Sequence, residues 1–355
     1  MVLTIIVFII VLGLLIFVHE LGHFLAAKKA GVKVEEFAFG FAPRLWSRKK
    51  GETRYSINLI PLGGYVKLYG EEGEHLKDPK SFYSKPLLSR LLVIVAGVIM
   101  NFVLAWILFW IGFTIGMPVT SLNPNDIPGA TIKSEVVVAE TLSNSPAEKS
   151  QITKGDIILS ANGQTLNNPD DLKNITKANL GKKINFVIKR YGIKKEISAQ
   201  LSKDKDAPLG VSILEAQKVK VPFWRAPLVA FQELINLVVM IFQVLIGFFA
   251  VLFKTGKAEE VGVGPVGIWF IFKTATKLGA MYVLQLTALI SVNLGIINIL
   301  PFPALDGGRL IFWFYELIRK KRITPKVENV VHIIGFVILI ALIVLISIRD
   351  IMRGG

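Results

Sequence analysis

The sequence predicts a multi-span α-helical membrane protein with a β-rich domain inserted between its membrane helices. Three observations lead to this fold class. Hydrophobic residues make up 52% of the chain, which is more than soluble domains usually contain. Runs without charge at 2–18, 91–116 and 330–348 are each long enough to cross a hydrocarbon layer of about 30 Å. The segment 119–206 differs, because short apolar stretches alternate there with Asn, Gly and Pro turns.

The distribution of charge orients the membrane helices. A net charge of +15 could indicate nucleic acid binding, but the basic residues cluster beside the apolar runs, in 28–54 and in 319–326. The positive-inside rule places both segments on the cytoplasmic side. We therefore expect the N-terminus and the domain 119–206 outside the cytoplasm, and no nucleic acid partner.

Four core transmembrane helices satisfy this orientation, and in chain order we expect them at 1–27, 91–116, 278–318 and 330–348. The segment 225–253 is predicted to be an amphipathic helix at the membrane interface, because four of its polar residues fall on one helical stripe: Gln232, Glu233, Asn236 and Gln243. Its apolar stretch is also long enough for a spanning or re-entrant helix, so that alternative stays open.

The cytoplasmic basic segment 28–90 is predicted to contain a membrane-associated β-hairpin at 53–69. Its two expected strands, Thr53–Leu59 and Tyr65–Tyr69, are joined by a turn that contains proline and two glycines. An edge strand here could bind an extended peptide by β-augmentation, and a purely structural hairpin is the alternative. The candidate peptide-binding residues are Tyr65, Val66, Lys67 and Leu68.

The strongest chemical signal is His19-Glu20-Leu21-Gly22-His23 at the end of the first span. Histidines four residues apart on a helix project from one face, so His19 and His23 can bind one zinc ion with Glu20 beside it as general base. The alternative is two isolated histidines and a solvated carboxylate. Ionisable groups at the end of a membrane helix are costly, which favours the metal site.

Two histidines leave a catalytic zinc short of its usual three protein ligands. The candidate third ligand is Asp306, which lies in 298–308, where two prolines and two glycines interrupt an apolar run. Interrupted backbone at membrane depth is tolerated where it is buried in protein or lines a wet cavity. Asp306 alone could be a turn or cap residue. The predicted topology places it at the depth of His19, and zinc with a general base there predicts peptide hydrolysis.

Other polar features have structural interpretations. Asn101 is expected to form an interhelical hydrogen bond within the second span. His75 and His332 are expected at the surface or the interface and not as ligands. The glycine-containing stretch 261–267 is expected to be a loop, because no Gly-Lys-Ser/Thr follows it.

The order of these motifs resembles the bacterial site-2 protease family of RseP-type intramembrane zinc metalloproteases. H-E-x-x-H ends the first span, N-x-x-P-x-P-x-L-D-G-G lies on a later one, and residues 145–164 between them resemble a PDZ domain. The resemblance implies Zn²⁺ as cofactor, His19, His23 and Asp306 as its ligands, Glu20 as the catalytic residue and Asn298 as a substrate contact.

The same resemblance implies a multi-pass protein of the bacterial cytoplasmic (inner) membrane with an extracytoplasmic PDZ-like domain. Its expected partners are membrane lipid and single-span substrates, such as anti-sigma factors or remnant signal peptides. The chain departs from the family pattern in having one PDZ-like domain where RseP itself has two, and Val98 where relatives often carry proline. A non-catalytic PDZ-bearing scaffold is the main competing function. A transporter is weaker, because the broken span has no inverted repeat.

Overall fold

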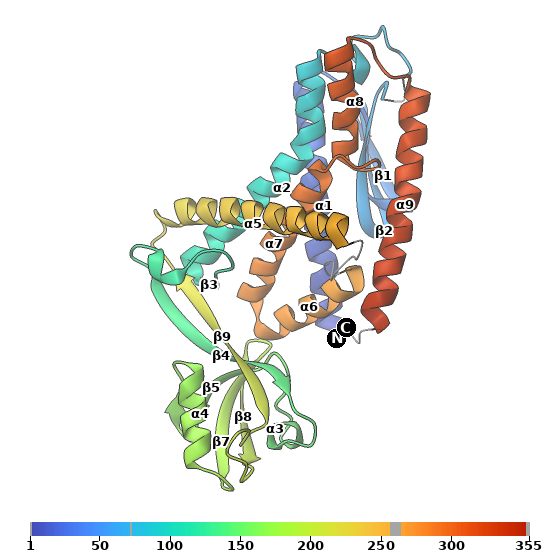
Figure 1. Cartoon of the computed structure of the whole chain (residues 1–355). Coiled ribbons are helices and arrows are strands. Elements are labelled where there is room, and N and C mark those ends of the chain that lie inside the picture. The colour runs from blue at the N-terminus through green and yellow to red at the C-terminus, as the bar shows by residue number, and fades with distance from the viewer. Residues whose placement is uncertain (1, 72, 256–263, 353–355) are drawn as a thin grey trace. The chain divides into compact units, whose positions relative to one another are not determined.

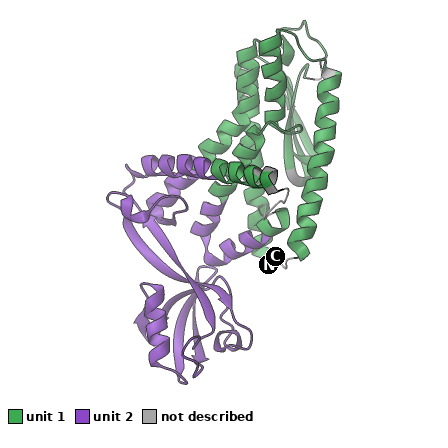
Figure 2. Ribbon diagram, in the orientation of Figure 1, with its two compact units in different colours: residues 1–105, 241–268, 287–355 green, residues 106–240, 269–286 purple. Residues whose placement is uncertain are grey.

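The computed structural model describes residues 2–71, 73–255 and 264–352, and it divides into two compact units (Figures 1 and 2). Each unit joins segments that are far apart in the sequence. Unit 1 lies within 1–105, 241–268 and 287–355, and unit 2 consists of 106–240 and 269–286.

Five of the described helices are long and apolar enough to cross a membrane. Many of their large apolar side chains are exposed; Ile333 and Leu345, for example, are 63% and 64% exposed. A helix that is apolar on all sides needs lipid or protein around it, so the chain is a membrane protein. The five helical stretches are Val2–Lys29, Leu87–Ile115, Ala226–Phe248, Ala280–Ile299 and Lys326–Met352.

Two helices replace one continuous span near the second metal motif, and the break between them lies in unit 1. Helix α7 (Ala280–Ile299) ends before 300–305, and α8 (Asp306–Arg319) begins immediately after it. A Cβ atom on Gly307 would collide with the backbone carbonyl of Leu300, so only glycine permits this close turn. The break places Asp306 at the first position of α8, where the helix dipole favours a carboxylate.

The strands of unit 1 do not form the hairpin predicted at 53–69. Strands β1 (Val34–Lys50) and β2 (Thr53–Leu68) pair with each other, and Phe37 lies opposite both Val66 and Tyr55. The first half of β1 therefore separates the two stretches that we expected to pair. Short-range turn signals identified both stretches, but the partner strand comes from 34–41, which the sequence analysis left unassigned. Within the described sheet, 64–68 has a pairing strand on one side only.

Helix α5 (Ala226–Thr255) contains one buried carboxylate. Glu233 is 1% exposed and accepts hydrogen bonds from the backbone N–H groups of Thr120, Ser121 and Leu122. The Ser121 hydroxyl adds a fourth donor at 2.8 Å. Glu233 is therefore buried within unit 2, where these donors satisfy its carboxylate, and it does not share the exposure of the other residues in the predicted polar stripe.

Unit 2 contains a seven-stranded sheet in the order β3-β9-β4-β5-β7-β8, with β6 paired to β5. The predicted domain 119–206 is too short, because β9 pairs with β4 over ten residue pairs and β3 pairs with β9. Apolar and polar residues do not alternate regularly in β9, so its sequence could not be distinguished from that of a linker. The strands are β3 (Met117–Pro118), β4 (Thr131–Thr141), β5 (Ile157–Ala161), β6 (Gln164–Thr165), β7 (Lys183–Arg190), β8 (Ile193–Gln200) and β9 (Val211–Lys220).

Two helices, α3 (Pro146–Lys149) and α4 (Pro169–Ala178), complete the β-rich domain. Helix α4 begins with a capping box in which Asn168 and Asp171 satisfy each other's backbone N–H groups. The core contains Phe186 and Ile152, both fully buried. Short 3-10 turns lie at Phe82–Ser84 in unit 1 and at Pro124–Asp126 in unit 2.

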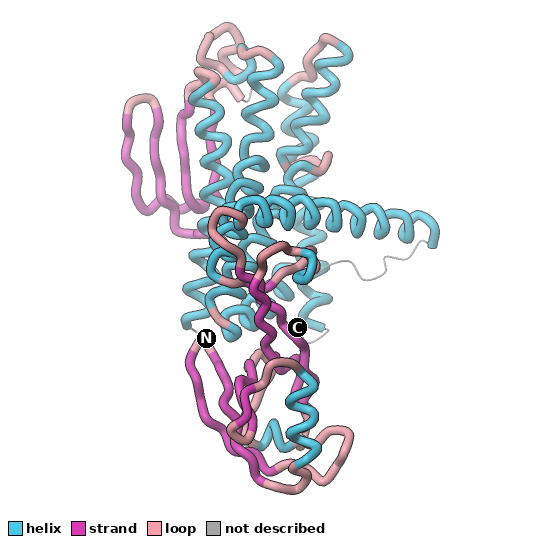
Figure 3. The backbone as a smooth tube through the Cα atoms, turned by 90° about the vertical axis from the view of Figure 1, so that its left-hand side faces the viewer, coloured by secondary structure: helices cyan, strands magenta, loops and turns pink. Residues whose placement is uncertain are grey.

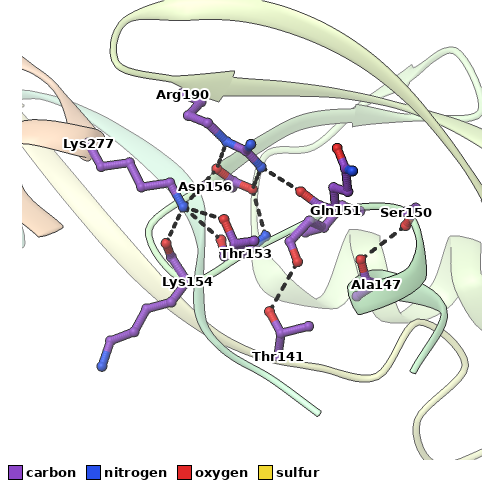
Figure 4. A network of polar contacts seen from close by, with 10 residues as sticks. Thr141, Ala147, Ser150, Gln151, Thr153, Lys154, Asp156, Arg190 and Lys277 are labelled. Atoms are coloured by element: carbon purple, nitrogen blue, oxygen red, sulfur yellow. Dashed lines mark hydrogen bonds and ion pairs between the residues drawn. The ribbon is translucent and has the colours of Figure 1, made fainter. Parts of the chain in front are cut away.

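Helix α6 (Pro265–Leu278) begins inside the stretch that we expected to be a loop, whose residues 261–263 lie outside the described chain. Its end packs on the β-rich domain through Ala275 and a polar network (Figure 4). Asp156, with a fully buried side chain, pairs with Arg190 at 2.6 Å and with Lys277 at 3.2 Å. Lys277 also donates to the Thr153 and Lys154 carbonyls.

We expect Asp156→Asn to destabilise this network by about 3 kcal/mol, since it leaves two partly buried cations without their counter-charge. Hydrogen exchange of the β5 and β7 amides in the full chain measures the effect. Asp170→Asn is the matched control, because the Asp170 side chain is 76% exposed in its pair with Lys173. Equal protection of these amides in the two variants would contradict the stabilising role of Asp156.

The same pair predicts a pH dependence. Burial alone would raise the pKa of Asp156, but hydrogen bonds from Arg190 and the Thr153 N–H, with the charge of Lys277, hold that pKa below its usual value. A lowered folded-state pKa means that the stabilisation is present above about pH 4 and is lost as the pH falls further. Protection of β5 should therefore decrease in acid for the wild type and change less for Asp156→Asn.

Candidate metal centre

The two histidines of the H-E-x-x-H motif lie on one side of α1 (Val2–Lys29), near its end. Their Nε2 atoms are 3.2 Å apart. The Oδ2 atom of Asp306, from the start of α8, lies 3.1 Å from the Nε2 of His19 and 3.2 Å from that of His23. The break after α7 thus brings the three predicted ligands together from opposite ends of the chain.

These three atoms fit a zinc ion. A neutral imidazole whose proton is on Nδ1 directs a lone pair from Nε2, and a carboxylate oxygen is also an acceptor, so the three electron-rich atoms face one another. The Asp306 Oδ2 atom is buried and has no hydrogen-bond partner within the described part of the chain. Two imidazole nitrogens and one carboxylate oxygen form a known ligand set of catalytic zinc, with a fourth position open to water.

Both imidazoles form hydrogen bonds with groups of α2 (Leu87–Ile115). The Nδ1 atom of His23 lies 2.8 Å from the Val93 carbonyl, which can only accept, so this nitrogen carries the proton and Nε2 is free for the metal. The Nδ1 atom of His19 lies 3.1 Å from the amide of Asn101, a fully buried residue. The amide nitrogen makes this contact, and the Asn101 Oδ1 atom has no partner among the described residues; with the amide turned over, Oδ1 would accept the His19 proton instead.

Asn101 contacts the candidate metal centre, which was not predicted from the sequence. The expected interhelical bond exists, but its partner is one of the proposed metal ligands. Gly97, one turn earlier on α2, is adjacent to both rings, and a Cβ atom there would collide with the Nε2 of His23. The sequence did contain a signal for this contact, since Gly97 and Asn101 lie four residues apart on one helix face. Small residues allow membrane helices to approach closely, and polar residues form hydrogen bonds between them.

The candidate metal centre opens into a cavity of about 740 Å³ in unit 1. Glu20 lines this cavity together with the two histidines and Asp306. The edge of β2 forms another wall and brings all four predicted peptide-binding residues to it: Tyr65, Val66, Lys67 and Leu68. Asn298 is half-buried near the end of α7, outside the set of described residues that line the cavity, and its substrate contact stays a prediction.

Charged side chains that the sequence analysis did not single out surround another part of the cavity. Arg90 of α2 is 4% exposed and forms two hydrogen bonds with Glu316 of α8, at 2.7 and 2.9 Å. The Tyr83 hydroxyl donates to Glu328 of α9 (Pro325–Met352) at 2.5 Å. Burial, followed by this carboxylate, raises the pKa of Tyr83, so it remains a protonated donor. These pairs could not be predicted, because the paired residues are far apart in the sequence.

Glu71 connects the β2 edge to the helix that carries Asp306. One of its carboxylate oxygens accepts the Leu68 N–H at 3.2 Å, and the other pairs with Arg309, one turn after Asp306 on α8. An ion pair, in addition to strand pairing, therefore connects the edge strand to the helix that carries Asp306.

The other two histidines are not members of the cluster. His332 lines the cavity, and its Nδ1 accepts the Ala304 N–H at 3.0 Å. The His75 ring stacks on Tyr69 with centroids 4.7 Å apart. Among the described residues, His19, His23 and Asp306 form the group of His and carboxylate side chains that could hold a metal ion.

A membrane protein that brings H-E-x-x-H and a distant aspartate to one point belongs to the class of zinc metalloproteases. More particularly, this chain belongs to Peptidase family M50, whose family model matches residues 7–342. A protein of Clostridium perfringens is 36% identical over 351 residues and covers 95% of each chain. Zinc metalloprotease RasP of Shouchella clausii is 29% identical over 435 residues, covering 99% of both chains.

A second relative of the same name, zinc metalloprotease RasP of Geobacillus kaustophilus, is 29% identical over 430 residues, covering 99% of this chain and 98% of its own. Together these similarities extend over nearly the full chain, including the break between α7 and α8. The protein is therefore a zinc metalloprotease of the site-2 protease type, with Zn²⁺ as its cofactor.

We expect Asn101→Leu to weaken zinc binding by about 10- to 100-fold, because a ligand that loses its outer hydrogen bond is poorly oriented. Competition with a chelator, with zinc measured by atomic absorption, gives the affinity. Thr114→Val is the control, since within the described chain the Thr114 hydroxyl bonds to the Trp110 carbonyl of its own helix and does not reach the histidines. Loss of zinc should be far larger in His23→Ala. An unchanged affinity in Asn101→Leu would remove Asn101 from the support of the site.

Proposed function

We propose that this protein hydrolyses peptide bonds within the transmembrane segments of single-span membrane proteins. The observation that carries the proposal is one cavity in which His19, His23, Asp306 and Glu20 lie beside the open edge of β2. An intramembrane protease must bind its substrate in extended form, because a helix hides its peptide bonds. An edge strand provides main-chain hydrogen bonds for such a segment, and a metal centre beside it provides the chemistry.

We assign the ligand role to His19, His23 and Asp306 and the general base role to Glu20. Zinc, when bound, supplies a Lewis acid that activates water and polarises the scissile carbonyl. Glu20 lies on α1 between the two ligands and faces the cavity, so it is placed to accept the proton of the attacking water. It then returns this proton to the amine of the leaving strand. Val93 and Asn101 keep the two imidazoles in the required orientation.

The substrate strand in this proposal lies along the edge 64–68 and pairs with the residues that precede Leu68. Leu68 already donates its N–H to Glu71, so the end of the edge is occupied and pairing is confined to the residues before it. Glu71 and Arg309 keep this edge in a constant position relative to Asp306. This arrangement selects substrates that unwind locally, which Gly, Ser and Pro make less costly in a helix.

For topology we propose four spans, with α5 at the interface of the cytoplasmic membrane. Figures 1 and 3 show that the part of α5 in unit 1, residues 241–255, runs across the direction of α1 and α9 and not alongside them. A helix parallel to the bilayer plane would have this orientation, and the exposed Gln232, Asn236 and Gln243 agree with it. The β-rich, PDZ-like domain then lies outside and selects substrates, which include anti-sigma factors or remnant signal peptides in regulated intramembrane proteolysis.

A PDZ-bearing scaffold without catalysis is the competing function. It requires neither a carboxylate between the two histidines nor a peptide-binding edge in the same cavity. Glu20 lies between the two histidines, and the edge of β2 lines the same cavity of unit 1; both observations support the enzyme.

We expect Glu20→Gln to retain zinc and to cleave a transmembrane substrate about 10²- to 10⁴-fold more slowly, because the amide cannot accept a proton. Purified protein with a single-span substrate in detergent gives the rate, and mass spectrometry locates the cut. Glu74→Gln is the control for loss of one negative charge, since Glu74 does not line the described cavity. A zinc-loaded Glu20→Gln protein that cleaves at the wild-type rate would refute the assigned role.

The topology is testable because the chain contains no cysteine. Single cysteines in place of Lys49 and Arg322 should react with an impermeant maleimide only from the cytoplasm, and one in place of Asn167 only from outside. Labelling of the Arg322 position from outside would instead establish α5 as a fifth crossing.

A further inference from the structure

A second cavity of unit 1 lies between α1 and one face of the β1–β2 sheet. Its volume is about 540 Å³. Its walls are almost entirely apolar and include five aromatic rings, contributed by Phe17 of α1 and by Phe37, Phe39, Trp46 and Tyr55 of the sheet. The catalytic residues Glu20 and Asp306 do not line it. The proposed proteolysis therefore leaves this groove without a role.

The sheet face that lines the groove continues into basic side chains. Residues directly opposite each other in an antiparallel pair point to the same face, and alternate residues along a strand share it. Trp46 lies opposite Ile57, and Arg48 lies opposite Tyr55, so Arg48 is on the groove face, one step beyond Trp46. Lys50, opposite Thr53, follows on the same face, and both basic side chains are exposed.

Along α1, as along the sheet, the apolar residues of the groove are followed by a basic residue. Ile10, Leu14 and Phe17 line the apolar part. Phe24, farther along, contacts the Tyr55 ring with centroids 6.0 Å apart, and the ammonium group of Lys28 lies 5.8 Å from the Phe24 ring. Lys28 is eleven residues beyond Phe17, or about 16 Å along a helix. This is close to the depth of one hydrocarbon leaflet, half of about 30 Å.

The cations at this end have few counter-charges. Glu52, in the turn between β1 and β2, pairs with Lys80 at 2.6 Å, and Glu36 is bonded to Arg44 at 2.8 Å and to Ser56. Across the described chain, no ion pair to an acidic residue is formed by Arg48, Lys50 or Lys28. An apolar groove that ends in two or three uncompensated cations has the polarity of an anionic amphiphile.

We propose that this groove binds one anionic phospholipid of the cytoplasmic leaflet. An acyl chain lies between Phe17 and Trp46, and the phosphate group lies at Arg48 and Lys28. Hydrocarbon is the occupant that apolar walls favour at membrane depth, since water would find almost no polar partner there. Arginine suits the phosphate because it donates two parallel hydrogen bonds. The bound lipid packs against Phe37, whose other neighbour across the sheet is Val66 of the proposed substrate edge.

Trp46 is the reporter for this site. The full-length protein is reconstituted into phosphatidylcholine vesicles that contain one-fifth of either phosphatidylglycerol or phosphatidylcholine with brominated acyl chains. The quenching of Trp46 is the difference between the wild type and Trp46→Phe, since five other tryptophans contribute to the signal. We expect brominated phosphatidylglycerol to quench Trp46 several-fold more effectively than brominated phosphatidylcholine. Equal quenching by both lipids would overturn the proposal, because the groove would then only face bulk lipid.

Two variants separate a site from general surface charge. Arg48→Gln should reduce the preference for phosphatidylglycerol about fivefold, the effect of one basic residue near an anionic membrane. Lys49→Gln, the adjacent residue on the opposite sheet face, should leave the preference unchanged. Equal losses in both variants would refute a specific headgroup contact. Relief of quenching by a single-span transmembrane peptide added to the vesicles would likewise count against the lipid, because the groove would then be a site for a protein helix.

Discussion

The mutual repulsion of three electron-rich atoms within a mostly apolar unit is the constraint on which the rest of unit 1 depends. Two imidazole nitrogens and a carboxylate oxygen lie 3.1–3.2 Å apart, and a zinc ion bound by all three would make that arrangement favourable. Holding them there requires a helix that ends in histidines, a second helix that approaches closely enough to orient both rings, and a chain break that brings in the aspartate. Gly97, Asn101 and the turn before α8 satisfy these requirements.

Several buried or partly buried ion pairs in this protein connect two secondary-structure elements. Arg90 with Glu316, and Glu71 with Arg309, each connect two elements around the metal cavity. Asp156 with Arg190 and Lys277 does the same between the β-rich domain and α6 in unit 2. Such pairs gain little net stability, since desolvation offsets their attraction, but breaking one leaves a buried charge. Their effect is to specify geometry where apolar packing alone would permit sliding.

Much of the fold was predictable from local patterns. Apolar length indicated the membrane helices, and the H-E-x-x-H spacing indicated the ligand pair, because helical periodicity determines which side chains share a face. Asp306 was identified because zinc needs a third ligand and the surrounding prolines and glycines mark a break. Predictions that depended on which strands pair with each other were less accurate. The hairpin at 53–69 was wrong because 34–41 lies between its two strands, and the domain limit at 206 was wrong because β9 adds to β4.

The sequence by itself determined the chemistry: which residue types could bind a metal, which could act as a base, and that the chain lies in a membrane. These follow from composition and spacing within single helices. Only the tertiary structure decided which surfaces meet. It gave Asn101 a proposed metal ligand, His19, as its partner, placed the β2 edge in the same cavity as the candidate metal centre, and joined Glu71 to Arg309. The physical reason is that a contact between residues far apart in the sequence depends on how whole elements pack, and no local pattern encodes that packing.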